Sequence, residues 1–186
     1  MKKVLIISGH PDLKNSTANK KILEVLAEKL PDAKIEKLDE LYPDYKFDVA
    51  QEQKSLEEAD VIVFQFPFHW YDVPGILKLY IDKIFLHGWS YGSKGKALEG
   101  KTIIFSTTTG APSDLYRSGG EFKHEVKEFM YNLRRFAILC CMTPLEPIIS
   151  CGMMYVPEVS PKEQKDLVIA KAESHAQRII KTIESL

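Results

Sequence analysis

Short apolar runs that do not alternate with polar residues set the strongest limit on what this chain can fold into. Four of them, rich in Val, Ile and Phe, lie at 3–8, 61–66, 102–107 and 147–151. Runs of this length and density predict strands that are buried on both faces, as in a parallel sheet. A weaker run at 33–38 alternates and therefore suits an edge or near-edge strand.

Segments with apolar residues at helical spacing lie between these runs. They cover 22–30, 76–85, 122–133 and 167–183, and Ser160-Pro161 supplies a cap and a first-turn proline for the last of them. Strands alternating with helices predict an α/β fold with a doubly wound sheet between two layers of helices. The short crossovers favour a flavodoxin-like three-layer fold, with a five-stranded parallel sheet in the order 2-1-3-4-5.

Composition limits the class of protein. At 186 residues the chain is expected to form a single domain over 1–186, large enough to bury a substantial core. A net charge of −1 gives no reason to expect a nucleic-acid partner. The cysteines, Cys140, Cys141 and Cys151, include an adjacent pair and no C-x-x-C spacing, so neither a disulfide framework nor a metal site is expected.

The sequence indicates a cytoplasmic protein. Two lysines precede the first apolar run, as in a signal peptide, but that run breaks at 8–12, too early for a secretory segment. No stretch approaches the ~20 apolar residues of a membrane helix. Peripheral attachment to a membrane protein, at the inner face of the plasma membrane, is compatible with these features.

The segment 65–74 places several aromatic rings directly after a buried strand. Phe68, His69, Trp70 and Tyr71 follow one another there, where surface loops are usually polar. Such rings expose apolar area unless something flat covers them, and open α/β sheets bind cofactors at the carboxyl ends of their strands. A ligand platform and a small cluster packed under a neighbouring loop are both open interpretations.

The loop at 9–19 leads into the first helical segment. Asn15, Ser16 and Thr17 can each cap that helix, and free backbone N–H groups with two hydroxyls suit a phosphate. The alternative is an ordinary helix cap. The loop has neither the glycines of dinucleotide-binding domains nor the Gly-Lys-Ser/Thr ending of nucleotide triphosphate sites. A phosphate here therefore points to a flavin mononucleotide tail rather than ATP.

Two loop histidines are candidate ligands of the same group. His10 stands beside the expected phosphate, and we favour a binding role for it. For His69 a ligand contact and a structural hydrogen bond are equally open.

The segment 106–120 also follows a buried strand and opens with four hydroxyl residues. Gly110 lets the backbone approach a ligand closely, and the N–H groups around it can form a small anion-binding nest. A long Ser/Thr-rich surface loop is the alternative, although loops of this length inside compact domains are often functional.

Taken together, these loops resemble those of the flavodoxin-like NAD(P)H:quinone oxidoreductases. The matching segments, in chain order, are 8–11, 16–19, 65–74, 77–83, 88–92 and 108–110. The resemblance covers nearly the whole chain and is closest to the short bacterial members. Some of those members serve as ancillary proteins of glutathione-regulated potassium-efflux systems, and 41–44 with 77–92 carry this closer likeness.

The resemblance implies a flavin site, with FMN as the expected cofactor and FAD as the alternative. It implies a phosphate held by His10, Ser16, Thr17, Ala18 and Asn19. It implies a ring system along Pro67, Phe68, His69, Trp70 and Tyr71. It implies contacts to the N1/O2 edge of the flavin from Thr108, Thr109, Gly110 and Ala111, with Tyr116 near that edge. Backbone amides after Trp70 would face the N5/O4 edge.

The third loop departs from the family pattern. Ala111 replaces a second glycine and is followed by Pro112, so the loop is expected to bend differently. The histidine that some members place shortly after the tyrosine is not evident, and Phe122 stands nearby. A family-type proton relay is therefore in doubt, and the resemblance implies Tyr116 and Trp70 as the catalytic residues.

The implied reaction is hydride transfer from NAD(P)H to the flavin, followed by two-electron reduction of a quinone. Both substrates would use one slot in turn, which gives ping-pong kinetics, and the resemblance implies a homodimer. An alternative is a regulatory ancillary subunit of a glutathione-gated potassium-efflux transporter, with that membrane protein as partner. An electron-transfer flavoprotein without a nicotinamide site is a third interpretation, which the net charge of −1 disfavours.

Overall fold

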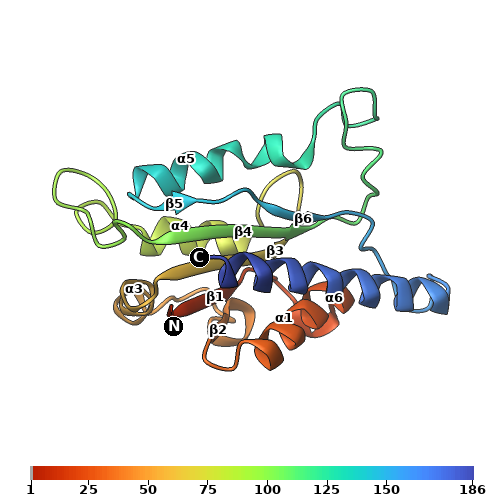
Figure 1. Ribbon diagram of the computed structural model, residues 1–186, viewed down its shortest axis with the longest axis horizontal. Helices are drawn as coiled ribbons and strands as arrows, with labels where there is room; N and C mark the ends of the chain where they lie inside the picture. Colours follow the sequence, from red (N-terminus) through yellow and green to blue (C-terminus); the bar gives the residue numbers. More distant parts are fainter. Residues whose placement is uncertain (1) are drawn as a thin grey trace.

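A parallel sheet forms the middle layer of the computed structural model, which describes residues 2–186 (Figure 1). Its strands are β1 (Val4–Ser8), β2 (Lys34–Lys37), β3 (Val61–Pro67), β4 (Thr102–Thr108), β5 (Thr143–Pro144) and β6 (Ile148–Ser150). Their order is β2-β1-β3-β4-β5, with β6 also paired to β4, and all these pairs are parallel. The predicted strand order is confirmed.

Burial explains why the strongest apolar runs became the central strands. Every residue of β3 is buried and nearly every residue of β4, whereas β2 lies at the edge and has a single buried residue, Glu36. The fifth strand is in two pieces. β5 pairs near the start of β4 and β6 near its end, and the segment between them contains Pro147, which cannot donate a ladder hydrogen bond. Only the β6 piece was predicted.

Helices cover both faces of the sheet. On one face α1 (Thr17–Lys29) and α6 (Lys162–Glu184) pack over one apolar cluster. On the other, α4 (Gly75–Ile84) and α5 (Tyr131–Leu139) pack over a second cluster, together with α3 (Val49–Glu58). The short elements are α2 (Leu38–Leu41) and the 3-10 turns η1 (Leu13–Asn15) and η2 (Val126–Met130). No helix within residues 2–186 has the length and apolar character needed to cross a bilayer.

Three details of the helices differ from the sequence-based expectation. Helix α3 was not predicted, because it carries few apolar residues; its start is fixed by Asp48, whose side chain accepts from the Gln51 N–H at 3.0 Å. Phe122 was wrongly included in the third helix, which begins at η2. Ser160 does not cap α6; its hydroxyl accepts the Val156 N–H at 3.0 Å instead.

A buried histidine joins α6 to the sheet. His175 is fully buried, and its ring nitrogens lie 2.6 Å from Ser106 Oγ of β4 and 2.8 Å from Ser150 Oγ of β6. Burial, reinforced by the nearby Arg178 guanidinium, lowers the pKa of His175 to about 3. The ring is therefore neutral at physiological pH, with one nitrogen donating and the other accepting.

Replacing His175 by glutamine is expected to alter the pH dependence of stability. Its folded-state pKa lies below the ordinary value of 6.5, so unfolding in acid takes up a proton. The stabilisation is full above that ordinary value and is lost as the pH falls toward 3. The free energy of unfolding of the wild type should fall by up to ~1.4 kcal/mol per pH unit in this window, and His175→Gln should remove that contribution.

Urea unfolding at a series of pH values measures this effect. At neutral pH the variant should also lose about 1–3 kcal/mol, because the buried Ser106 hydroxyl loses its partner. The matched control is His124→Gln, since His124 is exposed and pairs with Glu128 at the surface. Equal acid slopes in the two variants would contradict a neutral buried His175.

Candidate functional site

Three loops meet at the carboxyl ends of β1, β3 and β4 and enclose a cavity of about 350 Å³. This is the edge at which open parallel sheets bind ligands. The cavity is lined by His10, Asn15, Ser16, Thr17, Ala18, Asn19, Pro67, Phe68, His69, Thr108, Thr109, Gly110, Met153, Met154 and Tyr155.

The first loop presents the N-terminus of α1 to this cavity. Of the three candidate caps, Ser16 takes the position, and its Oγ accepts the Asn19 N–H at 3.1 Å. The Ser16 hydroxyl hydrogen stays free to donate to a ligand. Thr17 and Ala18 are the first residues of the helix, so their N–H groups have no partner in the preceding turn. Hydroxyls, free amides and the positive end of the helix dipole together suit an anion.

A buried amide holds the three loops in one arrangement. Asn19 is 3% exposed. Its Nδ2 donates to Thr108 Oγ1 at 3.0 Å, and its Oδ1 accepts from Gln65 Nε2 at 2.8 Å. One side chain of α1 therefore bonds to the ends of both β3 and β4. Asn19 therefore both lines the cavity and holds the loops around it in position.

His10 is held as a neutral hydrogen-bond donor. Its Nδ1 accepts the Asp12 N–H at 3.0 Å, so the ring hydrogen of the neutral form lies on Nε2. Burial, followed by the nearby His69, lowers the pKa of His10 to about 4. The rings of His10 and His69 have centroids 6.5 Å apart, and burial also lowers the pKa of His69. Both rings line the cavity.

The second loop makes a tight two-residue turn in an unusual conformation. His69 and Asp72 exchange backbone hydrogen bonds of 3.0 and 2.9 Å, and between them Trp70 and Tyr71 have φ values of 50° and 65°. This left-handed pair is typical of Asn-Gly hairpin turns, and for bulky residues it costs on the order of 1–3 kcal/mol each. Among residues 2–186, the N–H groups of Trp70 and Tyr71 find no acceptor. The turn therefore offers two free donors.

The rings of the second loop divide between packing and exposure. Phe68 and Tyr71 contact rings of the segment that follows β4, with centroid distances of 6.1 Å from Phe68 to Tyr116 and 5.3 Å from Tyr71 to Phe129 of η2. Phe68 nevertheless lines the cavity, and Tyr71 remains 45% exposed. Trp70, in contrast, is 94% exposed.

The third loop is tied to the segment after β6. Thr109 N–H donates to Ser150 O at 2.9 Å, and Met153 N–H donates to Thr109 O at 2.9 Å. The N–H groups of Gly110 and Ala111 have no acceptor in the described part of the chain. Gly110 carries no side chain, so a ligand in the cavity can approach its backbone closely.

The structure gathers most, but not all, of the predicted site residues around the cavity. The predicted residues outside the lining are Trp70, Tyr71, Ala111 and Tyr116. Tyr116 is half-buried against Phe68, and burial raises the pKa of its hydroxyl. The lining residues missing from the prediction are Asn15, Met153, Met154 and Tyr155. The last three follow β6, and the predicted strand order already placed that strand beside β4, so their position was available from the topology.

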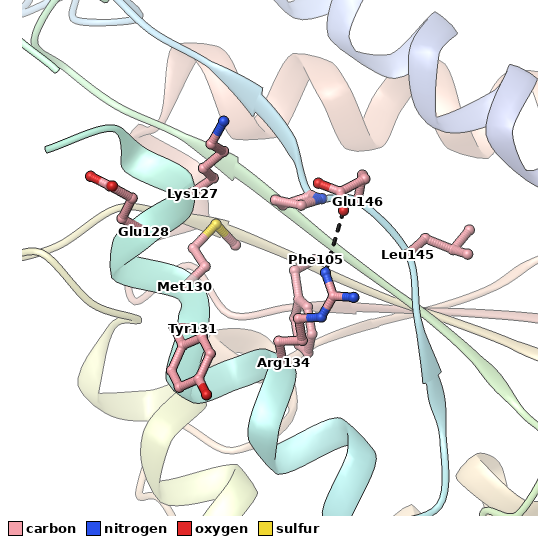
Figure 2. A pocket seen from close by; sticks show the side chains of 9 residues that line it. Phe105, Lys127, Glu128, Met130, Tyr131, Arg134, Leu145 and Glu146 are labelled. Atoms are coloured by element: carbon pink, nitrogen blue, oxygen red, sulfur yellow. Dashed lines mark hydrogen bonds and ion pairs between the residues drawn. The ribbon is translucent and has the colours of Figure 1, made fainter. Parts of the chain in front are cut away.

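A second cavity of about 450 Å³ lies elsewhere, between η2, α5 and the segment that joins β5 to β6 (Figure 2). Its lining includes Phe105 and the exposed ion pair between Arg134 and Glu146, whose Nη1 and Oε1 atoms are 3.3 Å apart. It shares no lining residue with the three-loop cavity. None of the predicted site residues lies there.

Comparison with known proteins agrees with this architecture. A family described as having a flavodoxin-like fold matches residues 2–176. The chain is 41% identical over 144 residues to the glutathione-regulated potassium-efflux system ancillary protein KefF of Enterobacter sp. (strain 638), covering 77% of this chain and 80% of that protein.

Two solved structures are similar over almost their full length. General stress protein 14 of Treponema denticola, in complex with FMN, has a TM-score of 0.86 and 31% identity, covering 96% of this chain and 98% of that one. An NADPH-quinone reductase of P. pentosaceus has a TM-score of 0.75 and 26% identity, covering 94% and 98%. The chain therefore belongs to the flavodoxin-like family, as the motifs of its three loops predicted.

Proposed function

We propose that this protein is a flavin-dependent NAD(P)H:quinone oxidoreductase that binds FMN in the three-loop cavity. One observation carries the proposal: a single cavity joins a hydroxyl-lined helix N-terminus to two further loops with free backbone donors. The FMN complex of the Treponema denticola protein and the quinone reductase of P. pentosaceus support the choice of ligand and reaction.

The first loop fits the phosphate of FMN. The hydroxyls of Ser16 and Thr17, the first amides of α1 and the Nε2 hydrogen of His10 are all donors. These donors would hold a phosphate without the help of a metal ion. Because His10 is neutral, it contributes a hydrogen bond, and the helix N-terminus supplies the favourable electrostatic potential.

The other two loops fit the ring system. Pro67, Phe68 and the methionines after β6 give apolar walls, while the free amides of 70–71 and 110–111 can face the polar edges of the rings. Trp70 projects into solvent from the turn and is available to cover an exposed ring face. FAD is the less favoured cofactor.

The residues around this cavity would hold a flavin, which would supply the chemistry of hydride transfer from NAD(P)H and two-electron reduction of a quinone. The protein itself would position the flavin and its substrates and stabilise charge that develops on the ring system. Amides around Gly110 stabilise negative charge at the edge they face, by the same logic as an oxyanion hole. The raised pKa of Tyr116 keeps its hydroxyl protonated at neutral pH, so it can donate a hydrogen bond beside that edge. One slot serves both substrates in turn, and we propose that a second copy of the chain completes it in a homodimer.

A second function is favoured by the similarity to KefF. The protein would then act in the cytoplasm as an ancillary subunit of a potassium-efflux membrane protein, at the inner face of the membrane. Co-purification with such a membrane protein would support this role. Fast turnover with many quinones in the absence of such a partner would support the enzyme.

The purified protein is expected to be yellow, or to become so on reconstitution with FMN. Under anaerobic conditions NADH or NADPH should bleach the flavin absorption, and a quinone should restore it. The absorption spectrum measures each step, and mass spectrometry of the released chromophore distinguishes FMN from FAD. A colourless protein that takes up no flavin would overturn the proposed function.

Replacing Thr17 by alanine is expected to weaken FMN binding through the phosphate alone. Losing one hydrogen bond to a charged group costs about 1.5–3 kcal/mol, which corresponds to roughly a ten- to hundredfold rise in Kd. Titration calorimetry with FMN measures the change. Riboflavin, which lacks the phosphate, is the control ligand and should bind to the variant and to the wild type with the same affinity. An equal loss for both ligands would place Thr17 away from the phosphate.

Trp70→Ala is expected to weaken flavin binding by about 1–3 kcal/mol, as for the loss of one stacked ring. Because Trp70 is 94% exposed, the free energy of unfolding should change little. Fluorescence titration with FMN gives the affinity, and urea unfolding gives the stability. The control is Tyr131→Ala, another exposed ring, at the start of α5. Wild-type affinity in the Trp70 variant would show that this ring does not cover the flavin.

A further inference from the structure

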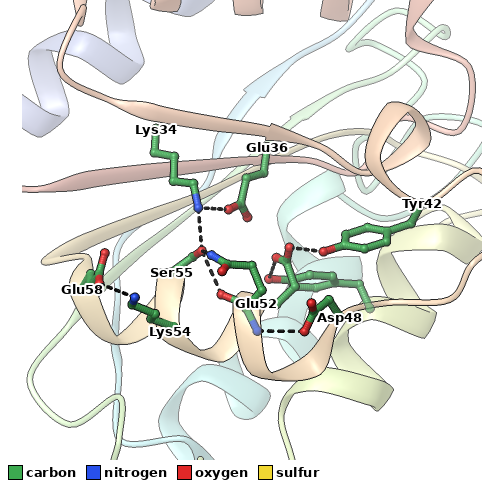
Figure 3. A network of polar contacts seen from close by, with 10 residues as sticks. Lys34, Glu36, Tyr42, Asp48, Glu52, Lys54, Ser55 and Glu58 are labelled. Carbon is green, nitrogen blue, oxygen red and sulfur yellow. Dashed lines mark hydrogen bonds and ion pairs between the residues drawn. The ribbon is translucent and has the colours of Figure 1, made fainter.

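Two glutamates are buried side by side beneath the edge of the sheet (Figure 3). Glu36 of β2 is 4% exposed and Glu52 of α3 is 1% exposed. Glutamate is almost never fully buried unless its charge is compensated, because removing a carboxylate from water is costly. The neighbours of this pair therefore decide its charge state.

The donors around the pair are unequally distributed. Glu52 accepts from Tyr42 Oη at 2.5 Å and from Tyr80 Oη at 2.9 Å, one at each carboxyl oxygen. Glu36 Oε1 pairs with Lys34 Nζ at 2.5 Å. Within the described residues, the other oxygen of Glu36, Oε2, is buried without any donor.

The balance of charges around the pair indicates which group can donate to Glu36 Oε2. The titratable groups that act on Glu52 are Glu36 from β2, Tyr42 from the segment after α2, and Tyr80 from α4, and Lys34 of β2 pairs with Glu36. Lys34 is the one cation among them, so two ionised carboxylates would leave one buried negative charge uncompensated. A proton on Glu52 removes that charge and can be donated toward Glu36 Oε2.

The neighbours of Glu52 act in the same direction. Burial, together with the neighbouring Glu36 carboxyl, raises the pKa of Glu52 to about 7, against the opposing effect of the Tyr42 and Tyr80 hydroxyls. Burial and Glu52 also raise the pKa of Tyr42 and of Tyr80, so both hydroxyls stay protonated and remain donors.

A chain of contacts leads from this pair to the cavity. Tyr42 directly follows α2 and its N–H bonds to Leu38 O at 2.9 Å. Helix α2 also carries Asp39, whose Oδ2 accepts the Leu13 N–H at 2.7 Å. Leu13 begins η1 in the first loop, immediately before the residues proposed to hold the phosphate.

We propose that Glu36 and Glu52 form a proton-binding site, and that release of the shared proton loosens the contact between α2 and the first loop of the cavity. Two buried like charges repel each other, and the repulsion is relieved when β2 and α2 move away from α3. The hydrogen bond from Leu13 to Asp39 weakens as a result. The effect on FMN affinity rests on the proposed function, whereas the proton site itself does not.

The sign of the pH dependence follows from linkage. The folded-state pKa of Glu52 lies above its ordinary value of 4.5, so the folded state holds a proton that the unfolded state has released. The stabilisation is full below that ordinary value and is lost as the pH rises through about 7. This dependence is opposite in direction to that of His175.

Carboxyl NMR of the protein labelled with ¹³C at its glutamate side chains tests the proton site. One glutamate resonance should titrate near neutral pH in the wild type and be absent from Glu52→Gln. The matched control is Glu58→Gln, which removes an exposed carboxyl of the same helix, paired with Lys54 at 4.0 Å, and should leave that resonance in place. If every glutamate of the wild type titrates in the ordinary acidic range, the proposal fails, and this outcome needs no variant.

Hydrogen exchange tests the coupling. Between pH 7 and 8.5, exchange at the Leu13 N–H should accelerate more in the wild type than in Glu52→Gln at each pH. FMN affinity should fall over the same range by at most about tenfold per pH unit, the limit for one proton, and stay level in the variant. Equal Leu13 exchange in both proteins would overturn the coupling. A protein that shows the neutral titration and the exchange difference but binds no FMN keeps the proton site and loses the proposed function.

Discussion

The buried side chain of Asn19 is the contact on which the geometry of the candidate site depends. The ends of parallel strands are brought to one edge by the sheet, but their loops are free to diverge. Asn19 bonds to Gln65 and Thr108, so a residue of α1 fixes the ends of β3 and β4 relative to the helix N-terminus. A buried amide that both donates and accepts a hydrogen bond is specific in direction as well as position. This buried polar link therefore fixes the three loops of the cavity relative to one another.

The sequence was most informative where burial is most complete. The runs at 61–66 and 102–107 became strands buried on both faces, and their order followed from short right-handed crossovers. Helix α3 was missed because its apolar periodicity is weak and its start depends on a side-chain cap at Asp48. The split of the fifth strand was missed for a similar reason, since two residues of β5 carry no pattern of their own.

The site residues also divide into those that the sequence could place and those that it could not. Residues at the ends of strands and at the start of α1 could be placed from topology, because the backbone alone decides where they lie. The positions of the rings in the second loop could not be predicted from the topology. The contact of Tyr71 with Phe129 and the exposure of Trp70 depend on the φ values of the turn and on the position of η2, which no local pattern encodes. Tertiary contacts outside the segment decide such positions.

The turn at Trp70 and Tyr71 has a consequence for how this fold can change. Glycine is the residue that its backbone favours, and a glycine at Trp70 would relieve conformational strain in the free protein. Retaining bulky rings there lowers the free energy of unfolding while keeping an aromatic face in solvent. Selection for thermal stability alone would favour replacement of the residues in this turn. The requirements of the candidate site and of stability therefore differ at these two positions.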